Sequence, residues 1–458
     1  MPDYTSIPGV RTEVQDFGTR ITPPILGPKV TVIGFTDNPN VPLEDPYILT
    51  RFEDVYAFDK ADGTPSELTK KLEELMAGQG RNLEVFVLSD GSGNRYSGDT
   101  VTPSQRFAMM ARAYELLLHH DVDIILPVGG PIDMTGLLST QNFGWQLANF
   151  CYQSTKEYNS AIGVIGVQPP SAAVAGTGIP SLALQSQWVN ALKAFDTTAL
   201  LGTNFVIYDG VTDGDLDGIP DNYAFLATVD ETIPVGSPPW NAGNVRKDAK
   251  GHPIDIGGYI RVVAGWVRVR NEAAKRINPV EGYYNVNGDA LLAGLISTLP
   301  PEIAFTNRVL AGGEMLRNLS ASQANDLSRY RFVSFWSKPT GFAVVSGVTG
   351  AHNVDDYHRS DFVRDTTVRI TQDAINVVRI AAGPFIGLPN NGVNRSALEN
   401  AIDSALGKMQ ERGALEGFRY SVISTPTMRV LGQIVVDLTI VCAFEIQTIT
   451  IRIGLSAA

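Results

Sequence analysis

Short apolar runs alternate with helical patterns over residues 30 to about 230, and this alternation limits the fold more than any other feature of the 458-residue sequence. The strand-like runs are Val30–Phe35, Leu83–Leu88, Val122–Leu126, Ile162–Val167 and Phe205–Tyr208. Strands that alternate with amphipathic helices at this spacing form a mostly parallel sheet with helices on its faces. The sequence therefore predicts an α/β unit.

Local signals place the helices of this unit and the strands that follow it. Thr102 can cap a helix, because proline follows at the first helical position and Gln105 can complete a capping box. Phe143–Tyr158 and Ser181–Phe195 have helical periodicity, whereas Ile260–Val269 fits a helix and a strand equally well. Two further strands, Phe332–Trp336 and Phe342–Val345, are expected to be joined by a Pro-Thr-Gly turn.

The pattern changes after Gly350, where a smaller α+β unit is expected. A long helix should run from about Tyr357 to Ala381. A second helix should begin at the capping box Ser396–Glu399 and end at Gly413, before a strand at Phe418–Ile423. These elements carry enough apolar residues at helical spacing to form a core of their own.

The last part of the chain, Leu431–Ile453, alternates apolar and polar residues on either side of a short interruption. It therefore resembles a strand, a corner and a second strand. A strand at a chain end needs a partner, because an unpaired edge exposes N–H and C=O groups. We expect Gly432–Ile440 to complete the sheet of its own subunit, and Glu445–Ile453 to reach a neighbouring subunit, with Val10–Val14 as its counterpart at the other end.

Charge and cysteine content exclude several classes of protein. With 48 acidic and 36 basic side chains the net charge is −12, which disfavours non-specific binding to nucleic acid or anionic membranes. Cys151 and Cys442 provide no disulfide framework, and we expect both to be buried free thiols. Neither a signal peptide nor an apolar run long enough to span a membrane is evident, so a soluble protein made in the cytoplasm is expected.

An acidic, glycine-containing loop lies in a predicted hairpin at residues 205–230. Its carboxylates stand at positions one, three, five and nine of a calcium-loop pattern, with a backbone carbonyl available at position seven. These candidate ligands are Asp213, Asp215, Asp217, Ile219 and Asp221. The loop resembles those of thrombospondin type 3 and dockerin-like modules, but Ala224 replaces the acid at position twelve. Either a calcium site with an additional ligand or a metal-free acidic hairpin fits this pattern.

No other cluster of residues forms a convincing active site. His119 and His120 are adjacent at the end of a helix and point in different directions. The glycines between Ala173 and Pro180 do not match a complete phosphate-binding motif, and Ser89–Asn94 does not form a nucleophile elbow. We therefore expect a protein that is not an enzyme, with no catalytic residues and no required cofactor.

The last hundred residues contain an ordered set of distinctive segments. These are Val354-Asp-Asp-Tyr-His-Arg, Gly383-Pro-Phe-Ile-Gly387, Arg412-Gly-Ala-Leu415, Gly432-Gln-Ile-Val-Val-Asp437 and Ala443-Phe-Glu445. Taken together they resemble the tail sheath proteins of contractile bacteriophage tails and related injection systems. Near the N-terminus, Ile7-Pro-Gly-Val10 also resembles the opening of that family. Cys442 departs from the family, in which proline is expected before Ala-Phe-Glu.

The resemblance implies a subtilisin-like α/β domain that lacks catalysis, since the matching histidine and the Gly-Thr-Ser nucleophile segment are missing. It implies four parts: an N-terminal arm at 1–29, an α/β sheath domain at 30–350, a C-terminal α+β domain at 351–440 and a C-terminal arm at 441–458. The arms would add strands to the sheets of neighbouring subunits. Their candidate residues are Val10, Thr12, Val14, Ile446, Ile449, Ile451 and Ile453.

The function implied is that of a structural subunit that polymerises in stacked rings around a tail tube and contracts to drive the tube through a cell envelope. Its partners would be copies of itself, the tube protein, and baseplate and tail terminator proteins, in a virion tail assembled in the host bacterial cytoplasm. Lys408 and Arg412 are candidate contacts with the tube. An α/β hydrolase-like enzyme and a calcium-dependent surface-binding module are the alternatives.

Overall fold

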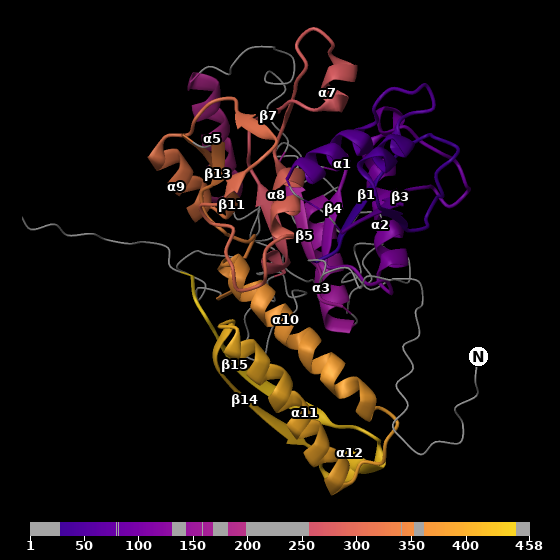
Figure 1. Cartoon of the computed structure of the whole chain (residues 1–458), viewed down its shortest axis with the longest axis vertical. Coiled ribbons are helices and arrows are strands. Elements are labelled where there is room, and N and C mark those ends of the chain that lie inside the picture. The colour runs from indigo at the N-terminus through magenta and orange to yellow at the C-terminus, as the bar shows by residue number, and fades with distance from the viewer. Residues whose placement is uncertain are drawn as a thin grey trace, which may run out of the picture.

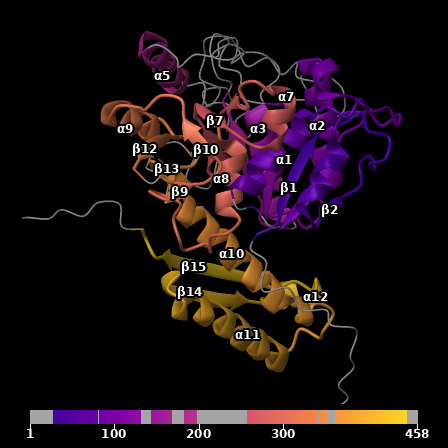
Figure 2. The ribbon, with the colours of Figure 1, turned by 45° about the horizontal axis from the view of Figure 1, so that its top comes forward.

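A computed structural model describes residues 28–78, 80, 82–130, 143–157, 159–167, 182–197, 256–339, 341–351 and 361–445. The described chain forms a large α/β body, from which a smaller C-terminal unit projects (Figure 1). Turning the molecule shows the same separation of a broad body and a narrow unit (Figure 2). The predicted arm strand Val10–Val14, the predicted strand Phe205–Tyr208 and the acidic loop lie outside the described residues.

The large body is built on a seven-stranded sheet with the order β11-β6-β5-β4-β1-β3-β2. All neighbours are parallel except β2 and β3, which are antiparallel at one edge. The strands are β1 (Val30–Gly34), β2 (Tyr47–Leu49), β3 (Leu83–Val87), β4 (Ile124–Pro127), β5 (Ile162–Gly166), β6 (Ile260–Val263) and β11 (Phe332–Val333). The predicted mostly parallel sheet is confirmed.

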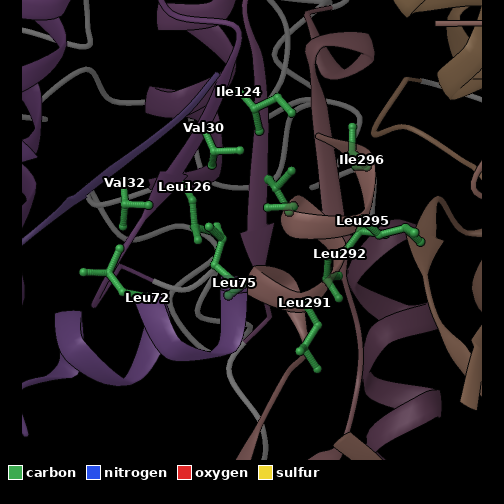
Figure 3. Packing of buried hydrophobic residues seen from close by; sticks show 14 of the residues in the cluster. Val30, Val32, Leu72, Leu75, Ile124, Leu126, Leu291, Leu292, Leu295 and Ile296 are labelled. Carbon is green, nitrogen blue, oxygen red and sulfur yellow. The ribbon is translucent and has the colours of Figure 1, made fainter. Parts of the chain in front are cut away.

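Helices cover both faces of this sheet, which is why β1 is buried along its whole length. Alternate side chains of β1 enter different cores: Val30 and Val32 face one side, and Ile33 faces the other. The first core includes α1 (Glu67–Ala77) and α8 (Asp289–Ile296). Figure 3 shows leucines of these two helices packed against valine, isoleucine and leucine side chains of the strands. The second core includes α2 (Pro103–Leu117), α3 (Phe143–Glu157) and α5 (Leu182–Thr197).

Several local predictions in the body are confirmed and one is refined. The Thr102 hydroxyl accepts a hydrogen bond from the Gln105 N–H, and the Gln105 side chain accepts one from the Thr102 N–H. The predicted strand Phe332–Trp336 divides in two. Its first part is β11, whereas its second part begins β12 (Phe335–Lys338), which pairs with β13 (Gly341–Val344).

Short elements complete the body. The undecided segment Ile260–Val269 contains two strands, β6 in the main sheet and β7 (Val267–Val269) in a small sheet with β8 and β10. The remaining strands and helices of the body are β8 (Tyr284–Val286), β9 (Val309–Leu310), β10 (Gly313–Met315), α7 (Glu272–Ile277) and α9 (Ala321–Arg329).

The C-terminal unit packs two long helices on a two-stranded sheet. Its elements are α10 (Asp365–Ala382), α11 (Gly392–Glu411), β14 (Leu415–Ile423), α12 (Pro426–Val430) and β15 (Val435–Cys442). It has its own apolar core, which includes Ile370, Ile402, Leu406 and Leu415. An independent core of this kind was predicted from the helical spacing.

Helix α11 starts earlier than predicted but ends where predicted. The capping box predicted at Ser396–Glu399 is wrong: α11 begins about one turn earlier, where the Asn391 side chain accepts a hydrogen bond from the Asn394 N–H at 2.9 Å. Asparagine caps a helix as well as serine does, so a helix can start at the earlier of two suitable residues. The predicted end of this helix at Gly413 is confirmed by its φ of +82° and by the hydrogen bond from the Ala414 N–H to the Met409 carbonyl.

Candidate assembly surface of the C-terminal unit

Helix α10 contacts both units, because one of its faces packs in the C-terminal core and the opposite face contacts the large body. One face packs in the C-terminal core through Ile370 and Ala374. The other face carries polar residues at spacings of four, three, four and three positions, which places them on one side of a helix. These residues are Asp365, Arg369, Gln372, Asn376 and Arg379, and each contacts the large body.

At the start of α10, the Asp365 carboxylate lies between two arginines. The Arg261 Nε on β6 is 2.6 Å from one oxygen, and the Arg369 Nε is 2.7 Å from the other. The three side chains are 1%, 0% and 5% exposed for Asp365, Arg261 and Arg369. Burial alone would raise the pKa of Asp365, but the two guanidinium groups outweigh it and lower that pKa below its ordinary value.

Further along α10, polar side chains bond to backbone atoms and side chains of the body. The Gln372 amide donates to the Ala161 carbonyl at 2.9 Å, and the Ser160 hydroxyl donates to the Asn376 side-chain oxygen at 3.0 Å. The Arg379 guanidinium donates to the Thr155 carbonyl at 2.6 Å, in the last turn of α3, where a cation is favoured. The C-terminal unit is therefore held in one orientation by contacts along almost the whole of α10.

Strands β14 and β15 form an antiparallel pair whose inner face lies on the helices. Phe418, Tyr420 and Val422 are opposite Ile440, Leu438 and Val436, and all six side chains pack against the C-terminal core. The prediction that Gly432–Ile440 completes the subunit's own sheet is confirmed by β15. Among the described residues this sheet has two strands, so each strand has one edge without a neighbouring strand, and such edges readily accept another chain.

A groove runs beside β14, between this strand and α11. It is lined by Phe418 to Val422 of the strand and by the acidic residues Glu399 and Asp403 of the helix. The Tyr420 hydroxyl donates to the Glu399 carbonyl at 3.0 Å. Burial raises the pKa of Tyr420, and the carboxylates of Asp403 and Glu399 add to this effect. The groove beside β14 therefore has the two carboxylates of α11 and the Arg419 guanidinium of the strand in its lining.

The structure gives positions for two of the predicted site residues. Arg412 follows the last residue of α11 and forms ion pairs with Asp373 of α10 and with Glu302 of the large body. It therefore lies at the junction of the two units. Lys408, one turn earlier, is exposed. Contact of either residue with a tube stays a prediction.

The other predicted site residues lie outside the described ranges. These are the candidate calcium ligands Asp213, Asp215, Asp217, Ile219 and Asp221, and the arm residues Val10, Thr12, Val14, Ile446, Ile449, Ile451 and Ile453. Within the described ranges, no group of three or more His, Cys, Asp or Glu residues could hold a metal. No helix in the same ranges is long and apolar enough to cross a membrane.

The polar side of α10 is a packed surface that the predictions from the sequence do not include. Asp365, Arg369 and Gln372 lie on this side. Their helical spacing opposite the apolar stripe is also what a helix with one packed face and one solvent-exposed face shows, so it does not indicate that this side is packed. Their partners could not be found in the same way, because Arg261 precedes Asp365 by 104 residues.

No family model and no curated protein matches the sequence. Solved structures do match over nearly the whole chain. A chain of the anti-feeding prophage baseplate is 12% identical with a TM-score of 0.55, covering 99% of this chain and 100% of its own. The helical sheath of the anti-feeding prophage in its contracted state is 13% identical, with a TM-score of 0.54 and coverages of 98% and 99%. The chain has the fold of a contractile-sheath subunit.

A third structure supports this conclusion from another particle. The contracted PVC sheath complex of an extracellular contractile injection system is 11% identical, with a TM-score of 0.55 and coverages of 99% and 98%. The predicted resemblance to sheath proteins is thus confirmed at the level of the fold. The sheath fold includes the large α/β body and the C-terminal unit together, since each match covers nearly all of both chains.

Proposed function

We propose that this protein is a structural sheath subunit that polymerises around a tail tube and contracts to drive the tube through a target cell envelope. The observation that carries the proposal is the sheet β14–β15, which within the described part of the chain has two strands and two open edges, in a chain with the sheath fold. An open sheet edge offers a row of main-chain donors and acceptors to an incoming strand. A subunit with two such edges can bind strands from two neighbours.

The incoming strands are proposed to be the two ends of neighbouring chains. Alternation of apolar and polar residues in the N-terminal segment Val10–Val14 and over Thr448–Ile453 of the C-terminal segment suits strands with one packed face. Main-chain pairing of this kind can be kept while subunits rotate about short connections. Linked subunits could then change from an extended to a contracted lattice without separating.

The attachment of α10 supports movement of each subunit as one rigid body. Its polar face is bonded to β6, to the end of α3 and to the start of β5, and its first turn contains the buried Asp365 cluster. Separating the two units would take the Asp365 carboxylate away from the buried Arg261 guanidinium, and breaking a buried ion pair costs several kcal/mol. Movement during contraction would therefore be concentrated in the connections between subunits.

The partners are copies of this chain, the tube protein, and baseplate and tail terminator proteins, and assembly takes place in the cytoplasm of the host bacterium. One neighbouring structure is described as a baseplate, which fits a chain that meets this part of a particle. The α/β body would be a subtilisin-like domain without catalytic function.

Electron microscopy of the purified protein, alone and with its tube protein, tests this function. We expect ring stacks or tubes from the full chain. A variant that lacks residues 446–458 should stay folded, because it retains β15 and the C-terminal core, but it should not assemble. A variant that lacks only Leu455–Ala458, beyond the proposed strand, serves as the control and should assemble.

Two results would contradict the proposal in different ways. Assembly of the variant without residues 446–458 would refute strand exchange by the C-terminal end. A full chain that remains monomeric under all assembly conditions, with and without tube protein, would refute the sheath function itself.

Calcium binding by Asp213, Asp215, Asp217 and Asp221, with the Ile219 carbonyl, is a separate proposal. It rests on the spacing of these residues in the sequence. Calorimetric titration with calcium tests it, and an Asp215→Asn variant should abolish the heat of binding.

A further inference from the structure

The large body has two opposite edges, because its seven-stranded sheet ends in β2 on one side and in β11 on the other. Strand β12 begins two residues after β11 and forms a small sheet with β13 and β9. Figure 2 shows this small sheet on one side of the body and β2 on the other. Neighbouring strands are about 4.8 Å apart, so the two ends of a sheet of this width are separated by about 30 Å.

The edge that contains β2 is acidic. We call residues 44–54, which include β2 and the first residues of the 3₁₀ helix η1 (Phe52–Phe58), the acidic edge. These residues comprise four carboxylates and one arginine. Glu44 forms an ion pair with α2, whereas Asp45 and Glu53 are exposed to solvent. The acidic edge therefore presents negative charge to a partner.

The opposite edge is basic. We call residues 307–310 and 335–339, which include β9 and β12, the basic edge. They contain Arg308 and Lys338 and no aspartate or glutamate. Arg308 is exposed, and the Lys338 ammonium lies 5.5 Å from the centre of the Trp336 ring.

Exposed apolar side chains lie within both edges. At the acidic edge, Ile48 is 67% exposed and Phe52 is 42% exposed. At the basic edge, Trp336 is 39% exposed and Val309 is 41% exposed. Both of these residues are opposite Ala343 of the central strand β13, so they lie on the same face of the small sheet. Apolar side chains bordered by polar ones are typical of an interaction surface.

The partner that fits the acidic edge is another copy of this chain. The net charge is −12, so copies repel each other except where surfaces of opposite charge meet. Around the acidic edge, residues 36–62 contain seven acidic and two basic side chains. Around the basic edge, residues 305–345 contain two acidic and five basic side chains. Complementary surfaces on opposite sides of one body join copies head to tail, and such contacts generate rings or helices.

We propose that adjacent copies bind edge to edge, with the acidic edge of one copy on the basic edge of the next. This inference rests on the proposed function and specifies a contact between large bodies in addition to strand exchange. The exposed apolar side chains of the two edges pack together, while the carboxylates of one copy face Arg308 and Lys338 of the next.

Exchange of the charges between the two edges tests this contact. The acidic-edge variant is Asp45→Lys/Glu53→Lys, the basic-edge variant is Arg308→Glu/Lys338→Glu, and the combined variant carries all four substitutions. Circular dichroism verifies that each full-length protein is folded. Sedimentation and electron microscopy then give the protein concentration at which polymers form.

The control is Glu272→Lys/Lys275→Glu, an exchanged ion pair on α7 that is exposed and lies outside both edges. We expect the acidic-edge and basic-edge variants each to need about tenfold more protein to polymerise, because like charges then face each other at every contact. These two variants change the net charge in opposite directions, so a loss in both is not an effect of net charge. The combined variant and the control should polymerise like the original chain.

Cross-linking tests the same contact without a change of charge. The variant Ile48→Cys/Val309→Cys has one new thiol at each edge, and the native Cys151 and Cys442 are buried. A short bismaleimide cannot join thiols about 30 Å apart within one chain. We therefore expect it to produce a ladder of covalent oligomers from polymers of this variant, and none from either single-cysteine variant.

The inference would be overturned if the acidic-edge and basic-edge variants polymerised at the same concentration as the control. A folded combined variant that did not recover polymerisation, or polymers of the double-cysteine variant that gave no ladder, would also overturn it. Covalent dimers from Ile48→Cys alone would overturn it by showing that like edges meet. If a charge variant does not fold, the cross-linking result decides. An original chain that never polymerises would instead refute the proposed function.

Discussion

Replacement of Asp365 by asparagine is the most informative change at the junction of the two units. Asparagine keeps the size and shape of the side chain but removes the charge that is shared by Arg261 and Arg369. Both arginine side chains are almost fully buried, at 0% and 5% exposure. The change therefore leaves two buried cations without their common anion.

The expected loss of stability follows from the contacts that remain. Removing one partner of a buried ion pair costs roughly 3–5 kcal/mol. Arg369 would still donate to the carbonyls of Leu299, Pro300 and Ile303. Arg261 would still donate to those of Gly258 and Tyr259, so both cations keep hydrogen bonds but lose their countercharge. We therefore expect the free energy of unfolding to fall by about 3–5 kcal/mol.

Chemical denaturation measures this loss, and hydrogen exchange in α10 shows where it occurs. The matched control is Asp373→Asn on the same helix, whose ion pair with Arg412 is partly exposed. Pairs of this kind contribute about 0–1 kcal/mol. The expected result is fast exchange along α10 in Asp365→Asn and nearly normal exchange in the control.

The pH dependence provides a second measurement of the same group. The pKa of Asp365 is lower in the folded protein than in the unfolded chain, so protonation favours unfolding. Its contribution is complete above the unfolded pKa of about 4 and is lost as the pH falls through the folded pKa. Asp365→Asn should therefore reduce the loss of stability in acid. Two results together would refute this reasoning. They are a free energy of unfolding for Asp365→Asn within about 1 kcal/mol of that of the control, and a loss of stability in acid equal to that of the original protein.

Two further predictions concern packing and reactivity. Gly294→Ala in α8 should destabilise the protein by about 1–3 kcal/mol or more, because the new Cβ would lie 2.4 Å from the Leu75 carbonyl oxygen. In Gly407→Ala in α11 the new Cβ meets no atom within 4 Å, so this change should stabilise the protein by up to about 1 kcal/mol. Chemical denaturation measures both changes, and midpoints of the two variants shifted in the same direction would contradict this account. Cys151 and Cys442 are buried free thiols, and burial raises the pKa of Cys151. Both should react with a thiol reagent only after unfolding, and fast labelling of the folded chain would contradict their burial.

The sequence by itself determined the type and order of most described elements. Runs such as Val30–Phe35 and Leu83–Leu88 are mostly apolar, with Thr31 and Glu84 as the polar residues, because their strands are covered on both faces. The alternation in Val435–Cys442 gave the inward and outward faces of β15. These features depend on the periodicity of neighbouring residues, which can be read directly from the chain. Helix starts were less certain, since Asn391 and Ser396 are both suitable caps.

Only the tertiary structure decided how these elements meet. It showed that the polar side of α10 binds the body, that Arg412 pairs with Glu302 at the junction, and that Asn390 joins the α10–α11 connection to the β14–β15 connection. Each of these contacts joins residues far apart in the sequence or on different elements. Local periodicity shows which residues share a face, but the partner of that face is selected by packing of the whole chain.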